Sequence, residues 1–143
     1  MAYIVELRDL NDSKLEEMLE NGREELFNLR FQQASARLEN YSRLKHVRRE
    51  IAQLKTVLGM RQLAVETAVS ESSELSTFLD GKEWNAVARY VYEDVGYKVD
   101  FTDEGGAELA SAMVDLNKKK VNGRRKRQSK DAPRLLMSYE IAG

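Results

Sequence analysis

The sequence predicts a mainly α-helical protein, in which an antiparallel two-helix hairpin is followed by a small α+β or irregular extension. Apolar residues recur at intervals of three and four in two adjoining segments, which is the spacing of one helix face. The connection between them, 34–42, is short, and short connections make neighbouring helices antiparallel. Beyond about residue 63 this pattern gives way to short mixed segments. We therefore divide the chain into a helical hairpin, 1–65, and an extension, 66–143.

The first helix of the hairpin is expected to begin near Asn11 to Ser13. Side chains of this kind accept hydrogen bonds from the free amides of a first helical turn. Glu16 and Glu17 follow, where negative charge complements the helix dipole. The apolar positions share one face and are Leu15, Met18 or Leu19, Gly22, Leu26 and Leu29.

The second helix has a more regular apolar seam. Its members are spaced three, four, three and four residues apart and are Leu44, Val47, Ile51, Leu54 and Leu58. A seam of this kind packs against one partner helix, which here is the first helix.

The extension combines segments of different type. SESSELS, 70–76, is polar and is typical of a linker or a helix start. Helices are expected over 82–94 and 104–118. YKVDF, 97–101, alternates in the manner of a short strand, and we expect it to pair with a second strand in the final LLMSYEI.

Charge is strongly segregated along the chain, although the net charge is only −1. Residues 40–63 include six basic side chains and one acid, whereas 66–115 include twelve acids and three basic side chains. The segment 118–130 holds eight basic residues and no acid. Because a partner senses the local field, this segregation matters more than the net charge.

Composition argues against several classes of protein. Without cysteine there is no disulfide framework, thiol nucleophile or cysteine-ligated metal. No apolar run approaches the roughly 20 residues that cross a bilayer, and the first residues do not resemble a secretory signal. We therefore expect a cytoplasmic protein that makes no contact with a membrane.

A catalytic or metal site is not expected either. His46, the only histidine, lies among basic residues with no acid placed to orient it, which favours a surface or RNA-facing side chain. The acids from Asp94 to Glu104 lack the spacing of a calcium loop, so we interpret them as a solvated face. Gly105 and Gly106 lack the other residues of a phosphate-binding loop and predict a turn. We predict a protein that is not an enzyme and that needs no cofactor.

The second helix also carries basic residues outside its seam, namely Lys45, Arg48, Arg49 and Lys55. These side chains can reach phosphates while the seam packs against the first helix. The same pattern fits the solvated outer face of a coiled coil. Composition alone leaves both interpretations open.

Three motifs between Glu6 and Leu63 resemble one known family. ELRDLNDSKLEEML, REELFNLRFQQA and SRLKHVRREIAQLKTVL are similar to the opening, first-helix and second-helix signatures of the bacterial-type large-subunit ribosomal protein twenty-nine family. The resemblance implies a hairpin bound to ribosomal RNA near the rim of the peptide exit tunnel, beside ribosomal protein twenty-three. It also implies that nascent-chain factors docking at this rim are candidate partners.

The resemblance further implies a set of RNA contacts and some local differences. The contacts carried over by motif are Asn28, Arg30, Gln32, Arg48, Arg49, Lys55 and Thr56, with Arg43 and Lys45 flanking them. The family commonly has glycine at Ala36, often proline at Tyr41 and often arginine at Gln53. Loss of the glycine predicts a differently shaped hairpin tip, and loss of the arginine removes one phosphate contact.

The extension lies outside the resemblance. Its basic run is a candidate second RNA contact, formed by Lys118, Lys119, Lys120, Arg124, Arg125, Lys126 and Arg127. A solubilising or nuclear-import-like tail is the alternative. The aromatic residues Trp84, Tyr90, Tyr92 and Tyr97 are interpreted as a small core rather than a base-stacking platform. For the whole chain, the alternative function is a free helical adaptor that binds a partner protein through the Leu44 to Leu58 seam.

Overall fold

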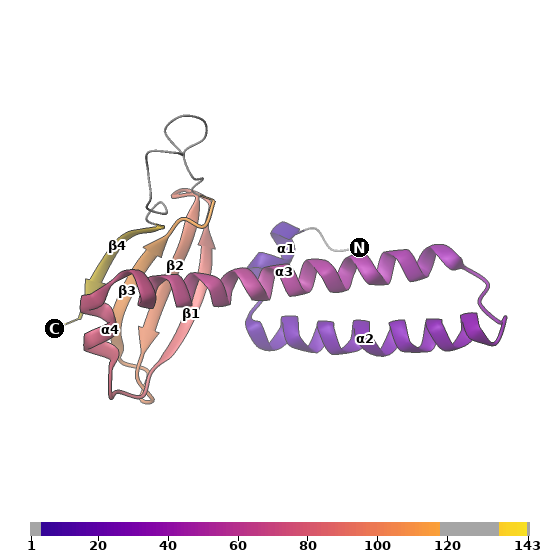
Figure 1. The fold of residues 1–143 in the computed structure, drawn as a ribbon, viewed down its shortest axis with the longest axis horizontal. Coiled ribbons are helices and arrows are strands. Elements are labelled where there is room, and N and C mark those ends of the chain that lie inside the picture. Colours follow the sequence, from indigo (N-terminus) through magenta and orange to yellow (C-terminus); the bar gives the residue numbers. More distant parts are fainter. Residues whose placement is uncertain (1–3, 118–134, 143) are drawn as a thin grey trace, which may run out of the picture. The chain divides into compact units, whose positions relative to one another are not determined.

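The computed structural model describes residues 4–117 and 135–142 (Figure 1). It divides into two compact units, which we call unit 1, Met1–Gly59, and unit 2, Met60–Gly143. No helix in the described ranges is both long and apolar enough to cross a membrane. In chain order the elements are α1 Ile4–Asp9, α2 Asp12–Ala34, α3 Tyr41–Glu71, α4 Ser73–Leu79, β1 Asn85–Val91, β2 Gly96–Thr102, β3 Glu108–Val114 and β4 Leu136–Ile141.

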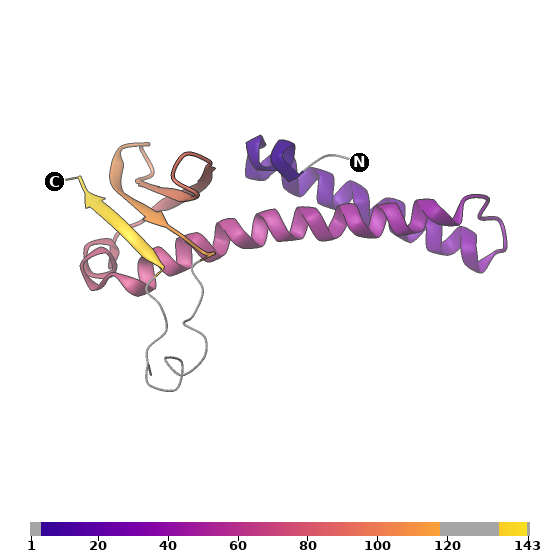
Figure 2. The same ribbon diagram turned by 90° about the horizontal axis from the view of Figure 1, so that it is seen from above.

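The expected fold class is wrong. Besides its helices, the described chain forms a four-stranded antiparallel sheet in the order β1-β2-β3-β4, so it is not mainly a helical hairpin with an irregular extension (Figures 1 and 2). The helices expected over 82–94 and 104–118 are wrong, because these segments form β1 and β3. The strand expected at 97–101 is present as β2. It pairs with β1 and β3, whereas β4 pairs with β3, so the expected pairing of YKVDF with LLMSYEI is also wrong.

In unit 1, α2 and α3 run side by side in opposite directions (Figures 1 and 2). The start of α2 is well fixed, because Asn11 Oδ1 accepts a hydrogen bond from the Lys14 amide at 2.9 Å. Close approach of the helices requires Gly22, where an added Cβ would lie 3.1 Å from Ile51 Cγ1. The buried core of the unit consists of Leu7, Leu15, Leu19, Leu29, Leu38, Val47, Ile51, Leu54 and Val57.

The tip of the hairpin turns at Ala36, which has φ 57°. The Arg37 amide donates to the Gln32 carbonyl at 2.8 Å, and the Ala36 amide donates to the Gln33 carbonyl at 3.1 Å. This pair of bonds is a Schellman motif, in which the residue after the helix cap takes a left-handed conformation. Ala36 therefore adopts a conformation that suits glycine better, because its Cβ crowds the backbone there.

Replacing Ala36 with glycine should stabilise unit 1 by about 0.5–1 kcal/mol. Relief of the left-handed strain contributes about 1–2 kcal/mol, and the greater freedom of glycine in the unfolded chain offsets part of it. Ala34 is the matched control, because it ends α2 in a helical conformation. Ala34→Gly should lose about 0.5–1 kcal/mol in the same urea titration followed by far-UV circular dichroism. Changes of equal sign in the two variants would contradict this account of the turn.

In unit 2, one face of the sheet is covered by α4 and by α3 from Met60 onward (Figure 1). Along β2 the side chains of Tyr97, Val99 and Phe101 point into this layer, as expected from the alternation of a strand. Val99 pairs with Ala88 on β1 and with Ala112 on β3. Small residues from the helices and the strands meet in the core, where Ala64, Ala68, Ala88, Ala110 and Ala112 are buried. Their size allows the two layers to pack closely.

The polar segment 70–76 contains the junction of α3 and α4. The Ser72 hydroxyl accepts a hydrogen bond from the Leu75 amide at 3.2 Å and caps α4, so the segment does include a helix start. Glu71 Oε2 accepts hydrogen bonds from the amides of Leu135 and Leu136 at 2.8 and 2.7 Å. This carboxylate ties the start of β4 and the residue before it to the end of α3.

Candidate nucleic-acid interface

The buried seam of α3 determines which of its side chains face away from the core of unit 1. Val47, Ile51 and Leu54 are at most 8% exposed and pack in the hairpin. At about 100° per residue, Lys45, Arg49 and Thr56 point to the opposite side of the helix, and Arg48 and Lys55 lie between that side and the seam. All five side chains are exposed. The helix therefore brings together the predicted RNA contacts of the second-helix motif.

We call Lys45, Arg48, Arg49 and Lys55 the basic strip. Within residues 4–117 and 135–142, no ion pair or side-chain hydrogen bond engages these four cations. Glu50, the acid nearest in sequence, lies on the side of the helix that lines a groove between α2 and α3. The strip therefore presents positive charge that no described carboxylate neutralises, which is the arrangement that attracts phosphates.

Thr56 adds a polar group next to the strip. Its hydroxyl donates to the Ala52 carbonyl at 2.8 Å, so the hydroxyl proton is already used. The oxygen lone pairs remain, and they can accept a hydrogen bond from a ribose 2′-hydroxyl.

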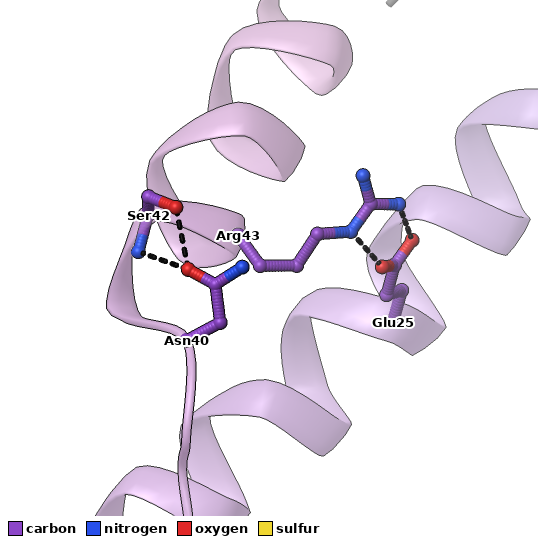
Figure 3. Close-up of polar contacts among 4 residues, drawn as sticks. All are labelled: Glu25, Asn40, Ser42 and Arg43. Atoms are coloured by element: carbon purple, nitrogen blue, oxygen red, sulfur yellow. Dashed lines mark hydrogen bonds and ion pairs between the residues drawn. The ribbon is translucent and has the colours of Figure 1, made fainter.

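Arg43 differs from the basic strip because it has a partner inside unit 1. Its Nε lies 2.6 Å from Glu25 Oε1, and its Nη2 lies 3.0 Å from Glu25 Oε2 (Figure 3). The hydrogen bond to Glu25 and the charge of Glu25 raise the pKa of the Arg43 guanidinium. Nearby, Asn40 Oδ1 accepts from the amide and the hydroxyl of Ser42 and orders the start of α3. Arg43 thus fastens the tip of the hairpin and has fewer donors left for RNA than the strip has.

Breaking the Glu25–Arg43 pair should remove a coupling energy of about 0.5 kcal/mol, and at most about 1, from unit 1. Both side chains are more than a third exposed, so solvent screens their attraction. A double-mutant cycle of Arg43→Gln, Glu25→Gln and the double variant isolates this coupling in urea unfolding. We expect it to shrink at about 1 M salt, where charges are screened within roughly 3 Å. A coupling of zero at low salt would mean that the pair does not fasten the tip.

The three predicted contacts on α2 do not share one face. Asn28, Arg30 and Gln32 are all exposed. Asn28 and Gln32 are one turn apart and lie together, whereas Arg30 is rotated by about 200° from Asn28. The structure therefore separates Arg30 from the two amides of the motif.

Two exposed aromatic residues next to these polar positions were not among the predicted contacts. Phe27 and Phe31 are 69% and 67% exposed and lie one turn apart on α2, facing away from Leu29. The positions of Leu26 and Leu29 on the apolar face were the available signal, because they exclude both phenylalanines from the core. Exposed aromatic rings beside arginine and amide side chains can stack on unpaired bases.

The departures from the family pattern have separate local settings. Gln53 is half-buried and lines the same groove as Glu50, so an arginine there would point toward α2 rather than join the basic strip. Tyr41 is the first residue of α3, a position that also accepts proline. The candidate contacts from Lys118 to Arg127 lie outside the described residues.

The alternative adaptor function requires the Leu44 to Leu58 seam to be available to a partner. Val47, Ile51 and Leu54 of this seam are buried within unit 1 itself, and Leu44 and Leu58 pack against the same core. A partner could use the seam only if the hairpin opened. The structure therefore counts against a free adaptor that binds through this seam.

Comparison with known proteins finds similarity over the hairpin. The family model described as Ribosomal L29 protein matches residues 5–61. The chain is similar to the large ribosomal subunit protein uL29 of Streptomyces griseus, with 51% identity over 65 residues, which are 46% of this chain and 88% of that protein. It is also similar to uL29 of Mycobacterium tuberculosis, with 53% identity over 62 residues, which are 43% of this chain and 80% of that protein. The basic strip, the α2 contacts and the hairpin tip all lie inside the matched range.

Proposed function

The chain belongs to the ribosomal protein L29 family, and from this membership we propose that unit 1 binds large-subunit ribosomal RNA. Like its relatives, the protein is a structural constituent of the large ribosomal subunit and not an enzyme. Its place is the ribosome, in association with ribosomal RNA and other ribosomal proteins.

The basic strip is the observation that carries the proposal. Its four cations are exposed on α3, outside the buried seam, and no described carboxylate pairs with them. Each phosphate contact releases condensed counterions, which favours binding at low salt. Contacts of this kind position the protein on folded RNA and do not read a sequence.

The remaining candidates act at the edges of this surface. Thr56 and the amides of Asn28 and Gln32 supply neutral hydrogen-bonding groups, and Arg30 supplies a further cation on another side of α2. Arg43 contributes less, because Glu25 already holds its Nε and Nη2. We propose the rim of the peptide exit tunnel, beside ribosomal protein twenty-three, as the location, on the basis of the three sequence motifs. Nascent-chain factors that dock at this rim would then be neighbours of the hairpin.

A salt titration of RNA binding tests the proposal. The full chain should bind large-subunit ribosomal RNA with a log–log salt slope of roughly −4 to −5 if about six phosphates are contacted. The protein should also remain with large subunits through a high-salt wash in a sedimentation experiment. A flat salt response, or recovery of the protein only in free fractions, would refute RNA binding by unit 1.

A further inference from the structure

The sheet of unit 2 has an edge strand that no other described strand covers. β1 pairs with β2 on one side, and in the described ranges no strand pairs with it on the other. Alternate backbone groups of an edge strand point away from its sheet and can pair with another chain. This edge belongs to residues beyond 61, which the family match does not include.

β1 lacks the features that usually protect an edge. Its register with β2 is unbroken from Asn85 to Val91, whereas the other two strand pairs each contain a shift in register. Its sequence, NAVARYV, has no proline and a single charged residue, Arg89. The side chain of Val87, in the middle of the strand, is 50% exposed. Regular, weakly charged and partly apolar edges favour the addition of a further strand.

The charges around β1 indicate what kind of strand would be added. Residues 60–117 and 135–142 together carry thirteen acidic and four basic side chains. Carboxylates flank both ends of β1, with Glu83 two residues before it and Glu93 and Asp94 directly after Tyr92. At the first end they are crowded. A hydrogen bond with Glu83, then desolvation and the charge of Asp103, raise the pKa of the Glu104 carboxyl.

We propose that β1 is a docking edge for an extended, lysine- and arginine-rich segment of a partner protein, which joins the sheet as an additional strand. Main-chain hydrogen bonds along β1 supply the affinity, and the carboxylates at its two ends select basic flanks. A second copy that paired through its own β1 fits less well, because it would bring the same carboxylates to the contact. RNA fits less well because its phosphates would face them.

A synthetic peptide of alternating valine and threonine with two lysines at each end provides the probe. It should bind the full chain and slow hydrogen exchange of the β1 amides. Val87→Lys should weaken binding roughly tenfold, because it replaces an apolar contact in the middle of the edge with a second positive charge beside Arg89, which repels the incoming basic strand. Met137→Lys is the matched control, since Met137 is 57% exposed on β4, the opposite edge, and should leave affinity unchanged. The same peptide with alternate backbone nitrogens methylated should not bind.

Several results would overturn the proposal. Equal weakening by Val87→Lys and Met137→Lys, or binding of the methylated peptide, would mean that simple charge attraction holds the peptide. Protection at β4 instead of β1 would identify the wrong edge. β1 amides already protected in the free chain, with no peptide binding, would mean that the edge is covered by the chain's own segment. Self-association that Val87→Lys abolishes would identify a second copy as the occupant, and displacement of the peptide by a single-stranded RNA would identify RNA.

Discussion

Truncating Phe101 to alanine should destabilise unit 2 by about 3–5 kcal/mol, a large share of the roughly 5–15 kcal/mol that holds a typical domain folded. The Phe101 side chain is fully buried on the inner strand β2, between Ala86 on β1 and Ala110 on β3. Alanine in its place would leave a cavity that these small neighbours cannot fill. We expect the loss to appear first in unit 2, because Phe101 has no place in the core of unit 1.

The chain contains its own reporter for this effect. Trp84 is the only tryptophan, and its ring centroid lies 5.3 Å from that of Phe101 in an edge-to-face arrangement. Tryptophan fluorescence during urea unfolding therefore reports on unit 2. Val87→Ala truncates a side chain of the same unit that is 50% exposed, and it should cost less than about 1 kcal/mol. Similar losses in the two variants would contradict the buried position assigned to Phe101.

The hairpin was accessible from the sequence because its signals are local. Asn11 caps α2, and the seam of α3 repeats at helical spacing without interruption. The same spacing wrongly predicts a helix at 82–94, where Trp84, Val87, Ala88 and Val91 also recur at intervals of three and four. In the structure Val87 and Ala88 point to opposite faces of the sheet, and only Ala88 enters the core. A short apolar run fits both the 3.6-residue period of a helix and the two-residue period of a strand. Packing in the tertiary structure decides which of them forms.

Alanine residues explain why a helix was wrongly expected over 104–118. The segment around Ala110 and Ala112 has high helix propensity, yet these residues alternate with the half-buried Ser111 and Met113 in β3. Their small size is what allows the sheet to pack against Ala64 and Ala68 of α3. The need for small side chains comes from α3, which lies about 40 residues earlier in the chain. The local sequence of β3 contains no sign of it.

In the candidate site, too, the features that depend on local spacing could be predicted, and those that depend on contacts between distant residues could not. The basic strip follows from the seam of one helix, so its members could be named from spacing alone. The pairing of Arg43 with Glu25 could not, because these residues are 18 positions apart and meet only through the register of α2 and α3. From the sequence, Arg43 looks like another cation of the strip. In the fold its guanidinium is paired with Glu25, whereas the cations of the strip are not paired with a described carboxylate.

Replacing the whole basic strip should have the largest effect on RNA binding. Lys45, Arg48, Arg49 and Lys55 changed together to glutamine should reduce affinity for large-subunit ribosomal RNA on the order of a hundredfold near physiological salt. The salt slope should become shallower by about 3, since four phosphate contacts are lost at roughly 0.7–0.9 each. Glutamine has a helix propensity close to that of lysine and arginine, and all four positions are exposed, so α3 should remain folded.

A charge-matched variant separates loss of the strip from loss of charge in general. Lys14, Arg23, Lys82 and Arg89 are exposed and lie outside the predicted contacts, and their replacement by glutamine changes net charge by the same amount. This variant should keep most of the affinity and nearly the full salt slope, because condensed counterions are released only where a cation meets a phosphate. Arg43→Gln should also bind RNA with nearly the affinity and salt slope of the unchanged protein, since the Arg43 guanidinium is already held by Glu25. If the charge-matched variant lost as much affinity as the strip variant, RNA would be held by the overall field of the protein and α3 would not be the interface.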